Sequence, residues 1–306
     1  MLYDLIIIGT GPAGMTAAIY AARRKIKFLL LGLDIGGQMN WSSEVDNYPG
    51  LPDFTGIEIV QKFNKHIKDY NVSPKLEEVL DIQKKDKTLL IKTKQNTYET
   101  KSIIISSGKK PRKLGVPGED NFLGRGVTYC ATCDAPFYKE KIVAVIGAGN
   151  SGLEASLFLA KYAKKVFLID VGVKLRGEPY LKDKVLANKK IIPVLGAKIT
   201  EILGDKSVKG IKYIKDNQQK IQELEGIFIE VGLIAKADFA KIVRKNKWGE
   251  IMIYRSTKTP EENMTSIPGI FAAGDVTDIP AKQIVVAAGE GAKAALAAFD
   301  YINRLK

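Results

Sequence analysis

The sequence predicts an α/β protein with two domains, the second inserted into the first. A buried strand, a glycine-rich turn and a helix follow one another twice along the chain, and 306 residues are ample for two hydrophobic cores. Two segments are interpreted as connectors, Lys109–Pro117 and roughly 246–250. If the chain crosses between the domains at both, the C-terminal segment returns to complete the first domain.

The first strand–turn–helix unit contains the apolar run Leu5–Ile8 and the G-x-G-x-x-G turn Gly9–Gly14, and the second contains Ile142–Ile146 and Gly147–Gly152. The first glycine of such a turn permits a tight bend, the second lets a pyrophosphate approach the backbone, and the third lets helix and strand pack closely. The pyrophosphate then lies on free N–H groups of the helix N-terminus. Two copies, each between a strand and a helix, predict two Rossmann-like dinucleotide-binding domains.

An acidic residue after the next strand distinguishes the two copies. In the second copy, the strand Val166–Ile169 ends at Asp170, 18 residues after Gly152. An acid at this position hydrogen-bonds the ribose hydroxyls of the adenosine and repels a 2′-phosphate. In the first copy, Asp34 comes late after the strand Phe28–Leu31, so an acidic contact there stays open.

The C-terminal part of the chain supplies the remaining elements of the first domain. The run Gly269–Asp275 predicts a strand that ends in a Gly-Asp turn, and Gln283–Ile302 predicts an alanine-rich helix. We therefore expect residues 1–112 and 248–306 to form one discontinuous domain and residues 113–247 to form the inserted one.

The only two cysteines, Cys130 and Cys133, form a C-x-x-C motif 14 positions before Gly147. Two cysteines are too few for a secreted disulfide scaffold or a four-cysteine zinc site. A zinc site completed by histidines is disfavoured because His66 is the only histidine, and we expect no metal. The motif predicts redox chemistry, in which one thiolate attacks a partner disulfide and the other thiol resolves the mixed disulfide.

Thiol–disulfide exchange also requires a proton donor for the leaving sulfur. Asp134 directly follows Cys133 and is a better candidate than His66, which lies in a polar segment expected to be a surface helix. The alternative role for Asp134 is that of a helix-capping carboxylate, and the two roles are compatible. We interpret His66 as structural.

Charge and hydropathy disfavour two classes of function. The net charge is +13, but the 47 lysines and arginines are scattered in short pairs, without the basic tail or patch that would indicate nucleic-acid binding. No apolar run is long enough to cross a bilayer, and the chain enters its first strand without a targeting segment. We therefore expect a cytoplasmic protein with no membrane or nucleic-acid partner.

With two dinucleotide motifs and a C-x-x-C-D between them, the sequence resembles the low-molecular-weight thioredoxin reductases over essentially its whole length. The matching motifs are Gly9–Gly14, Gly36-Gly37-Gln38, Asn47-Tyr48-Pro49-Gly50, Cys130–Asp134 and Gly274-Asp275. The C-terminal half also resembles the flavoprotein subunit of alkyl hydroperoxide reductase, in Lys282-Gln283-Ile284, Ala287–Lys293 and Ala298–Ile302. The thioredoxin-like region of that subunit has no counterpart here, so we expect the electron carrier to be a separate protein.

The resemblance implies FAD in the discontinuous domain, NADH or NADPH in the inserted domain, and a homodimer. It also implies that Cys133 faces the flavin, that Cys130 attacks the partner disulfide and that Asp134 is the acid. The inserted domain would rotate between hydride delivery and partner reduction, with the two connectors as hinges. The implied FAD contacts are Gly9, Thr10, Gly11, Pro12, Ala13, Gly14, Gly36, Gly37, Gln38, Asn47, Val79, Ser107, Gly108, Gly274, Asp275, Lys282, Gln283 and Ile284. The implied contacts of the nicotinamide nucleotide are Gly147, Gly149, Asn150, Ser151, Gly152, Asp170, Arg176 and Gly232.

Two departures from the family pattern concern the nicotinamide nucleotide. Members that use NADPH carry His-Arg-Arg and a further arginine after the second strand, whereas this sequence has Asp170-Val171-Gly172 and only Arg176. Replacement of an arginine clamp by an acid predicts a preference for NADH. The family turn Gly-x-x-Pro-Asn-Thr is Gly232–Ala237 here, which leaves ferredoxin or another electron donor open, although the intact turn Gly147–Gly152 disfavours it.

The expected partner is thioredoxin or a glutaredoxin-like protein. One alternative is the reductase component of a peroxiredoxin system acting through such a carrier. A ferredoxin–NADP reductase is disfavoured because that class lacks the C-x-x-C. A non-enzymatic nucleotide-sensing protein would leave Cys130 and Cys133 without a role.

Overall fold

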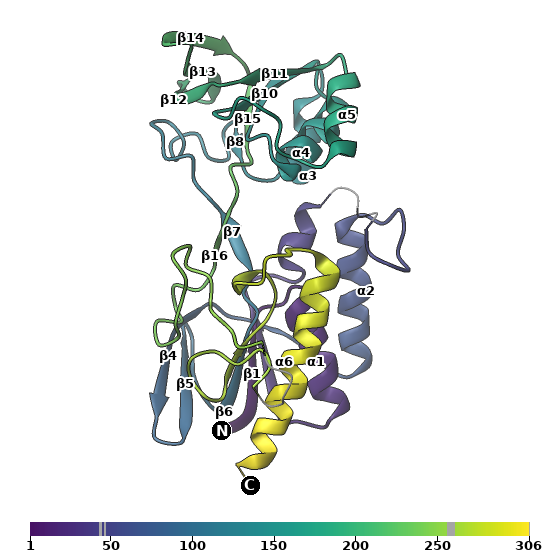
Figure 1. Ribbon diagram of the computed structural model, residues 1–306, viewed down its shortest axis with the longest axis vertical. Coiled ribbons are helices and arrows are strands. Elements are labelled where there is room, and N and C mark those ends of the chain that lie inside the picture. Colours follow the sequence, from purple (N-terminus) through teal and green to yellow (C-terminus); the bar gives the residue numbers. More distant parts are fainter. Residues whose placement is uncertain (43–44, 46, 256–260, 306) are drawn as a thin grey trace. The chain divides into compact units, whose positions relative to one another are not determined.

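The structure is a computed structural model that describes residues 1–42, 45, 47–255 and 261–305, and it divides into two compact units (Figure 1). Unit 1 comprises Met1–Lys110 and Ile234–Lys306, and unit 2 comprises Pro111–Leu233. Unit 2 therefore interrupts unit 1 in the chain, as the sequence predicted.

Unit 1 is built on a mixed sheet whose order is β3-β2-β1-β6-β5-β4, with β17 also paired to β6. The pairs β1–β2, β1–β6, β2–β3 and β6–β17 are parallel, and β4–β5 and β5–β6 are antiparallel. The strands are β1 (Leu2–Ile8), β2 (Phe28–Gly32), β3 (Lys75–Leu76), β4 (Val79–Lys85), β5 (Thr88–Thr93), β6 (Thr97–Ile105) and β17 (Ile270–Ala272).

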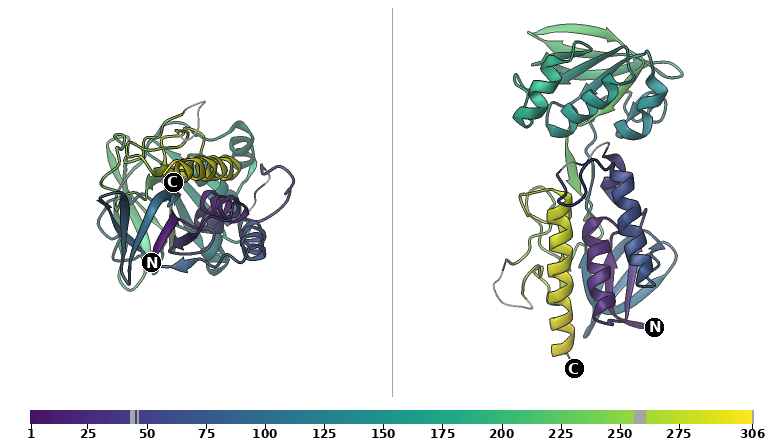
Figure 2. Two further views of the ribbon diagram at one scale, coloured as in Figure 1. Left: turned by 90° about the horizontal axis from the view of Figure 1, so that it is seen from below. Right: turned by 90° about the vertical axis from the view of Figure 1, so that its right-hand side faces the viewer.

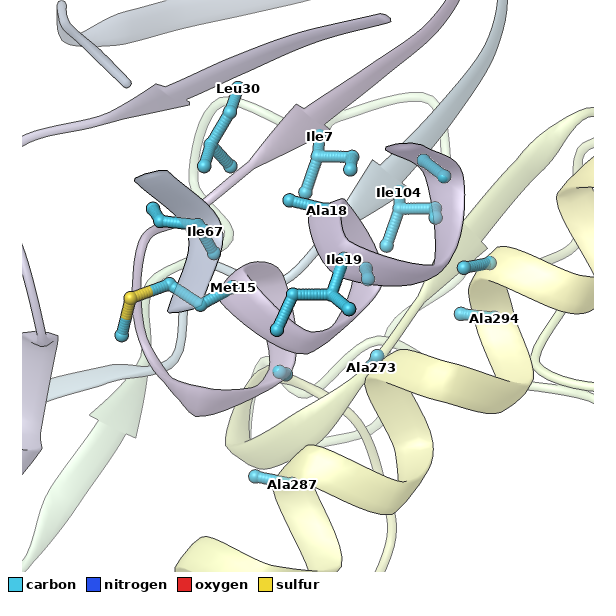
Figure 3. Close-up of a cluster of buried hydrophobic side chains, with 14 of the residues drawn as sticks. Ile7, Met15, Ala18, Ile19, Leu30, Ile67, Ile104, Ala273, Ala287 and Ala294 are labelled. Atoms are coloured by element: carbon cyan, nitrogen blue, oxygen red, sulfur yellow. The ribbon is translucent and has the colours of Figure 1, made fainter. Parts of the chain in front are cut away.

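Three helices pack against one face of this sheet, and α6 lies along α1 (Figures 1 and 3). Side chains of β1 alternate between the two faces, because Leu5 and Ile7 join the cluster under the helices while Ile6 and Ile8 join the cluster on the opposite face. The helices are α1 (Pro12–Arg23), α2 (Gly56–Asp69) and α6 (Ile284–Arg304), with two short 3₁₀ helices, η1 (Gly37–Trp41) and η3 (Gly274–Val276).

Unit 2 has a fully parallel sheet of order β11-β10-β9-β15-β8. Helices cover one face and a three-stranded antiparallel sheet covers the other (Figure 2). The parallel strands are β8 (Val127–Thr128), β9 (Ile142–Ile146), β10 (Lys165–Asp170), β11 (Ile191–Leu195) and β15 (Gly226–Ile229). The remaining elements are β12 (Lys198–Gly204), β13 (Val208–Lys215), β14 (Gln218–Glu223), α3 (Ala131–Asp134), η2 (Ala135–Tyr138), α4 (Asn150–Ala160) and α5 (Pro179–Ala187).

The chain crosses between the units at Lys110–Pro111 and at Leu233–Ile234. The crossing segments are the paired strands β7 (Lys109–Pro111) and β16 (Leu233–Ala235). The first crossing falls inside the segment expected to be a connector.

The second crossing differs from the expectation, which placed it after residue 247. Ala237 and Val243 already pack in the core of unit 1. The expected connector 246–250 is a turn within that unit, because Asn246 Nδ2 donates to Glu250 Oε2 at 2.7 Å. The sequence does not show which core apolar residues such as Ala237 and Val243 join, because they lie among polar residues. The second boundary of unit 2 is therefore decided only by tertiary packing.

In the described residues, no helix combines the length and apolarity that crossing a membrane requires.

Candidate functional site

The first glycine turn joins β1 to α1 in unit 1. A Cβ at Gly9 would lie 2.1 Å from the carbonyl oxygen of Ser106, and one at Gly14 would lie 1.8 Å from that of Gly9, so only glycine allows this approach of strand, turn and helix. Gly11 is different, because among the described residues a Cβ there would meet only Gly36 O, at 3.9 Å. The N-terminus of α1 has no side-chain cap.

Residues far apart in the sequence gather around this turn. Gln38 Nε2 donates to Asp275 Oδ2 at 3.3 Å, and Asn47 Nδ2 donates to Gln283 Oε1 at 3.1 Å. A Cβ at Gly108 would lie 3.5 Å from Gln38 Nε2. The structure thus brings together residues that the sequence placed in one FAD site from four separate motifs.

The C-terminal helix closes the same region. The carbonyl oxygen of Ala13 would lie 2.0 Å from a Cβ at Gly291, and the Cβ of Ala13 would lie 3.0 Å from one at Gly274. Ile284 begins α6, and Gln283 is its N-cap residue without a side-chain capping bond. Two helix N-termini, those of α1 and α6, therefore contribute free N–H groups to unit 1.

A cluster of charged side chains accompanies Asp275. Glu250 Oε1 lies 2.8 Å from Lys109 Nζ and 3.5 Å from Lys282 Nζ, and Lys282 Nζ also donates to Thr277 O at 2.6 Å. Burial raises the pKa of Asp275, and the charges of Lys282 and Lys109 oppose this rise. Burial lowers the pKa of Lys282. Lys109 and Glu250 did not stand out in the sequence, because they were interpreted as connector residues.

Other expected FAD contacts have structural partners. Thr10 Oγ1 donates to Asp34 O, and Gly37 N–H donates to Asp34 Oδ1 at 2.8 Å. Asp34 therefore holds the turn that contains Gly36 and Gly37, and a contact of its carboxylate with a bound nucleotide stays open. Ser107 Oγ donates to the carbonyl oxygen of Lys236 at 2.6 Å.

Two more expected FAD contacts belong to the secondary structure of unit 1. Val79 belongs to the apolar cluster on the sheet face opposite the helices. Pro12 is the first residue of α1, where its missing N–H costs no hydrogen bond.

The second glycine turn, in unit 2, repeats the geometry of the first. A Cβ at Gly147 would lie 2.2 Å from the carbonyl oxygen of Glu230, and one at Gly152 would lie 1.8 Å from that of Gly147. In the described part of the chain, a Cβ at Gly149 would meet no atom within 4 Å. The N-terminus of α4 again has no side-chain cap.

Asp170 and Arg176 form an ion pair, which the sequence did not predict. Arg176 Nη2 lies 2.8 Å from Asp170 Oδ2. The same oxygen accepts the N–H of Ala148 at 2.7 Å, and Asp170 Oδ1 accepts the N–H of Gly172 at 2.6 Å. Because Asp170 is only 3% exposed, it braces the glycine turn from within, and Arg176 is tied to it.

The remaining expected nucleotide contacts lie at the same edge of the sheet. Asn150 is bonded to Glu178, with its Oδ1 accepting the N–H of Glu178 at 2.8 Å. Ser151 interacts with the carboxyl group of Glu230 and opposes the rise of its pKa. Gly232 accepts the N–H of Arg112 at 2.9 Å through its carbonyl oxygen.

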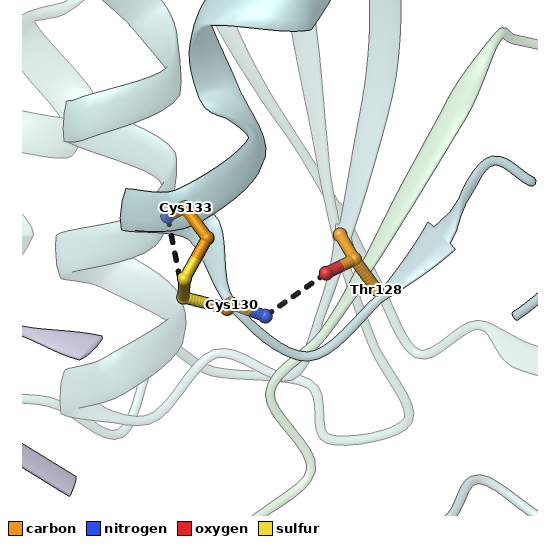
Figure 4. Close-up of a disulfide and its surroundings, with 3 residues drawn as sticks. All are labelled: Thr128, Cys130 and Cys133. Carbon is orange, nitrogen blue, oxygen red and sulfur yellow. Dashed lines mark hydrogen bonds between the residues drawn. A yellow bond between two sulfur atoms is a disulfide. The ribbon is translucent and has the colours of Figure 1, made fainter. Parts of the chain in front are cut away.

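Cys130 and Cys133 form a disulfide in unit 2, with an S–S distance of 2.07 Å (Figure 4). Cys130 is the N-cap residue of α3, and its Sγ accepts the N–H of Cys133 at 3.2 Å. The N–H of Cys130 donates to Thr128 Oγ1 at 3.1 Å. The N–H that points at Sγ of Cys130 would also stabilise a thiolate on this sulfur once the disulfide opens.

Asp134 is the last residue of α3 and lies close to Tyr138. Burial raises the pKa of the Tyr138 hydroxyl, and the charge of Asp134 adds to this rise. Tyr138 packs edge-on against Phe228, with ring centroids 5.1 Å apart. The spacing of four residues between Asp134 and Tyr138 was the available sequence signal for this electrostatic interaction.

Tyr129, next to the redox pair, is anchored to a buried acid. Its hydroxyl donates to Glu119 Oε1 at 2.6 Å, and Glu119 also accepts the N–H groups of Leu114 and Gly115. Burial and Glu119 raise the pKa of Tyr129 beyond its ordinary range. His66 is exposed on α2, and its ring centroid lies 5.7 Å from that of Tyr70, so its structural role stays a prediction.

Both glycine turns fit a dinucleotide. The first and third glycines make backbone approaches that no side chain allows, and the second leaves room where a pyrophosphate would lie. Each turn leads into a helix without a side-chain cap, so free N–H groups are available to phosphate oxygens. In the described residues, no group of three or more His, Cys, Asp or Glu side chains could hold a metal ion.

Comparison with known proteins agrees with this geometry. A family model described as pyridine nucleotide-disulphide oxidoreductase matches residues 3–291. An alkyl hydroperoxide reductase subunit of Staphylococcus epidermidis is 38% identical over 307 residues, which cover 99% of this chain and 59% of that protein. The chain thus spans less than two thirds of the length of this curated relative.

Solved structures of similar length also match. Thioredoxin reductase of Lactococcus lactis has a TM-score of 0.92 and 36% identity, with 99% of each chain covered. Thioredoxin reductase of T. acidophilum has a TM-score of 0.91 and 35% identity, with 100% of this chain and 99% of that chain covered.

Proposed function

The chain belongs to the pyridine nucleotide-disulphide oxidoreductase family and is of the thioredoxin reductase type, and from this premise we propose how it works. It transfers two electrons from NADH through FAD to the disulfide Cys130–Cys133, and then to a disulfide on a separate protein. The observation that carries the proposal is this disulfide, which lies in the same unit as a glycine turn with an open second glycine.

FAD belongs to unit 1 and the nicotinamide nucleotide to unit 2. The turn of unit 1 is enclosed by Gly36, Gln38, Asp275 and α6, which suits a cofactor that stays bound. The turn of unit 2 is open at Gly149, which suits a nucleotide that binds and leaves with each cycle. Bound FAD supplies the relay between the two-electron donor and the disulfide.

The two cysteines have different roles in thiol–disulfide exchange. After reduction, the thiolate of Cys130, stabilised by the N–H of Cys133, attacks one sulfur of the partner disulfide. The partner's other sulfur leaves as a thiolate and takes a proton, which Asp134 supplies. Cys133 then attacks Cys130 in the mixed disulfide, releasing the second partner thiol and restoring the disulfide.

NADH is the proposed donor rather than NADPH. Asp170 is buried at the end of β10, and the positive charge of Arg176 is already paired with it. A 2′-phosphate would therefore meet a carboxylate and no free arginine fork in this loop.

Stopped-flow reduction of the FAD-loaded protein tests this proposal. We expect NADH to bleach the flavin at least tenfold faster than NADPH at equal concentration. Slow bleaching by both nucleotides would contradict the proposed donor and favour ferredoxin or another donor. Cys133→Ser should keep FAD and its bleaching by NADH but reduce no partner disulfide, whereas Lys184→Ser, on the outer helix α5, should leave both reactions intact.

The proposed partner is thioredoxin or a glutaredoxin-like protein. The two structural relatives are thioredoxin reductases, whereas the curated relative is a subunit of alkyl hydroperoxide reductase, so supply of electrons to a peroxiredoxin is the second candidate. Steady-state assays with purified thioredoxin and glutaredoxin, each with and without a peroxiredoxin, separate the two. We also propose that the protein is a homodimer. We propose that it acts in the cytoplasm, where thiols are kept reduced.

A further inference from the structure

Glu230 lies at the point where the strand order of the parallel sheet of unit 2 reverses. The chain leaves the central strand β9 toward β10 and β11 on one side and reaches β15 on the other side. Ligands of such sheets bind across the carboxyl ends of the strands at this switch point. The N–H of Glu230 donates to Ile146 O at 2.7 Å, so Glu230 stands beside Gly147, on the β15 side of that point.

The side chain of Glu230 lies close to the first turn of α4. Its Cβ lies 3.7 Å from the position that a Cβ at Gly152 would occupy. Ser151, which is one of the expected nucleotide contacts, interacts with its carboxyl group and lowers its pKa. Glu230 and Ser151 are therefore polar residues next to the N-terminus of α4, where the pyrophosphate would bind.

The pKa of Glu230 lies near neutral pH. Burial raises the pKa of Glu230 to about 7, the charge of Glu154 adds to the rise, and the interaction with Ser151 opposes it. Glu154 on α4 is the titratable group that acts on Glu230, whereas the turn after β9 presents the uncharged Gly147 at this point. A pyrophosphate beside Gly149 would add two negative charges to the same site.

We propose that Glu230 is a positioning residue of the nicotinamide nucleotide site, and that it must be protonated for tight binding, so that binding takes up a proton. The inference rests on the proposed function, because it assigns the nucleotide to unit 2. Ionised Glu230 would repel the pyrophosphate, whereas protonated Glu230 carries no charge. The nucleotide in turn favours the protonated form by the same amount, as linkage requires.

Titration of the FAD-loaded protein with NAD⁺ tests this inference. Between pH 6 and pH 8 we expect the Kd to rise about tenfold, because each pH unit above the pKa reduces the protonated fraction tenfold. Calorimetry in two buffers of different ionisation heat should detect uptake of about one proton at pH 8. A Kd and a proton count that do not change with pH would overturn the inference.

Two variants make the assignment specific. Glu230→Gln keeps the shape of the protonated acid, so its Kd should change less than about twofold over the same range, with no proton uptake. Glu223→Gln, at an exposed acid on β14, should behave as the parent protein does. A Glu230→Gln variant with the parent pH profile would mean that another group titrates.

The outcome is separable from that of the proposed function. If NADH bleaches the flavin at pH 6.5 but NAD⁺ affinity is independent of pH, only the role of Glu230 fails. If neither NADH nor NADPH bleaches the flavin and NAD⁺ does not bind, the proposed donor fails and the role of Glu230 fails with it.

Discussion

The two glycine turns have the same backbone geometry but different surroundings. In both, the third glycine approaches the carbonyl oxygen of the first so closely that a Cβ would lie 1.8 Å from it. Around Gly11, however, the chain adds Gly36, Gln38 and a helix from the far C-terminus, whereas Gly149 stays open. The comparison teaches that segments distant in the sequence enclose one glycine turn and leave the other open, and we propose that this difference separates a dinucleotide that stays bound from one that exchanges.

The acids of the two turns differ in the same way. Asp34 in unit 1 is exposed and uses its carboxylate on the adjacent Gly37 turn. Asp170 in unit 2 is buried and bonds two backbone N–H groups and Arg176. Unit 2 also has the half-buried Glu230, whose partner is Ser151. We therefore expect charge selection of the nucleotide to reside in unit 2.

Alanine at the third glycine of each turn gives the largest expected effect. The new Cβ would clash with a carbonyl oxygen, and overpacking of this kind costs about 3 kcal/mol, equivalent to more than 100-fold in binding. Gly14→Ala should lose FAD and its yellow colour. Gly152→Ala should keep FAD but lose bleaching by NADH by about 100-fold.

Absorbance of the purified proteins and stopped-flow reduction measure the two effects. Gly289→Ala is the matched control, because a Cβ there meets no described atom within 4 Å. If Gly152→Ala lost FAD and Gly14→Ala kept it, the assignment of the two units would be reversed.

The next largest effect concerns Asp134, which belongs to neither turn. Asp134→Asn should slow reduction of the partner disulfide about 100-fold, because it removes the proposed proton donor. Bleaching of the flavin by NADH should not change. Rapid-mixing assays of the two half-reactions separate these rates, with Asp183→Asn on α5 as control. An unchanged rate with the partner would leave Asp134 as a structural neighbour of Tyr138.

The smallest effect tests charge selection in unit 2. Val171 follows Asp170 and is 67% exposed, so Val171→Arg adds a cation without disturbing the buried carboxylate. We expect the ratio of kcat/KM for NADPH to that for NADH to rise about tenfold. Val171→Gln controls for side-chain length. If the two variants gave equal ratios, the 2′-phosphate would not approach this loop.

Several parts of the fold were predictable from local sequence. The runs at β1, β9 and β10 are continuous and apolar because both faces of these strands are buried, so they stand out without any knowledge of their partners. The helix of residues 284–304 is alanine-rich because it packs closely on α1. The C-x-x-C spacing likewise brings both sulfurs within reach of a disulfide.

Other features depended on contacts between distant residues. The second boundary of unit 2 was placed too late because Ala237 and Val243 carry no sign of the core they join. The pair Lys109–Glu250 and the acid Glu230 were missed because an isolated charged residue looks the same in a loop and at a sheet edge.

By itself, the sequence determined the two strand–turn–helix motifs, the redox pair and the order of the domains. These features reside in short segments, where glycine sterics, cysteine spacing and strand burial act over a few residues. Only the tertiary structure decided that Asp170 is tied to Arg176, that Gln38 meets Asp275, and that Glu230 lies beside the turn Gly147–Gly152. The physical reason is that hydrogen bonds and charge effects depend on separation in space and on burial, which folding sets independently of separation along the chain.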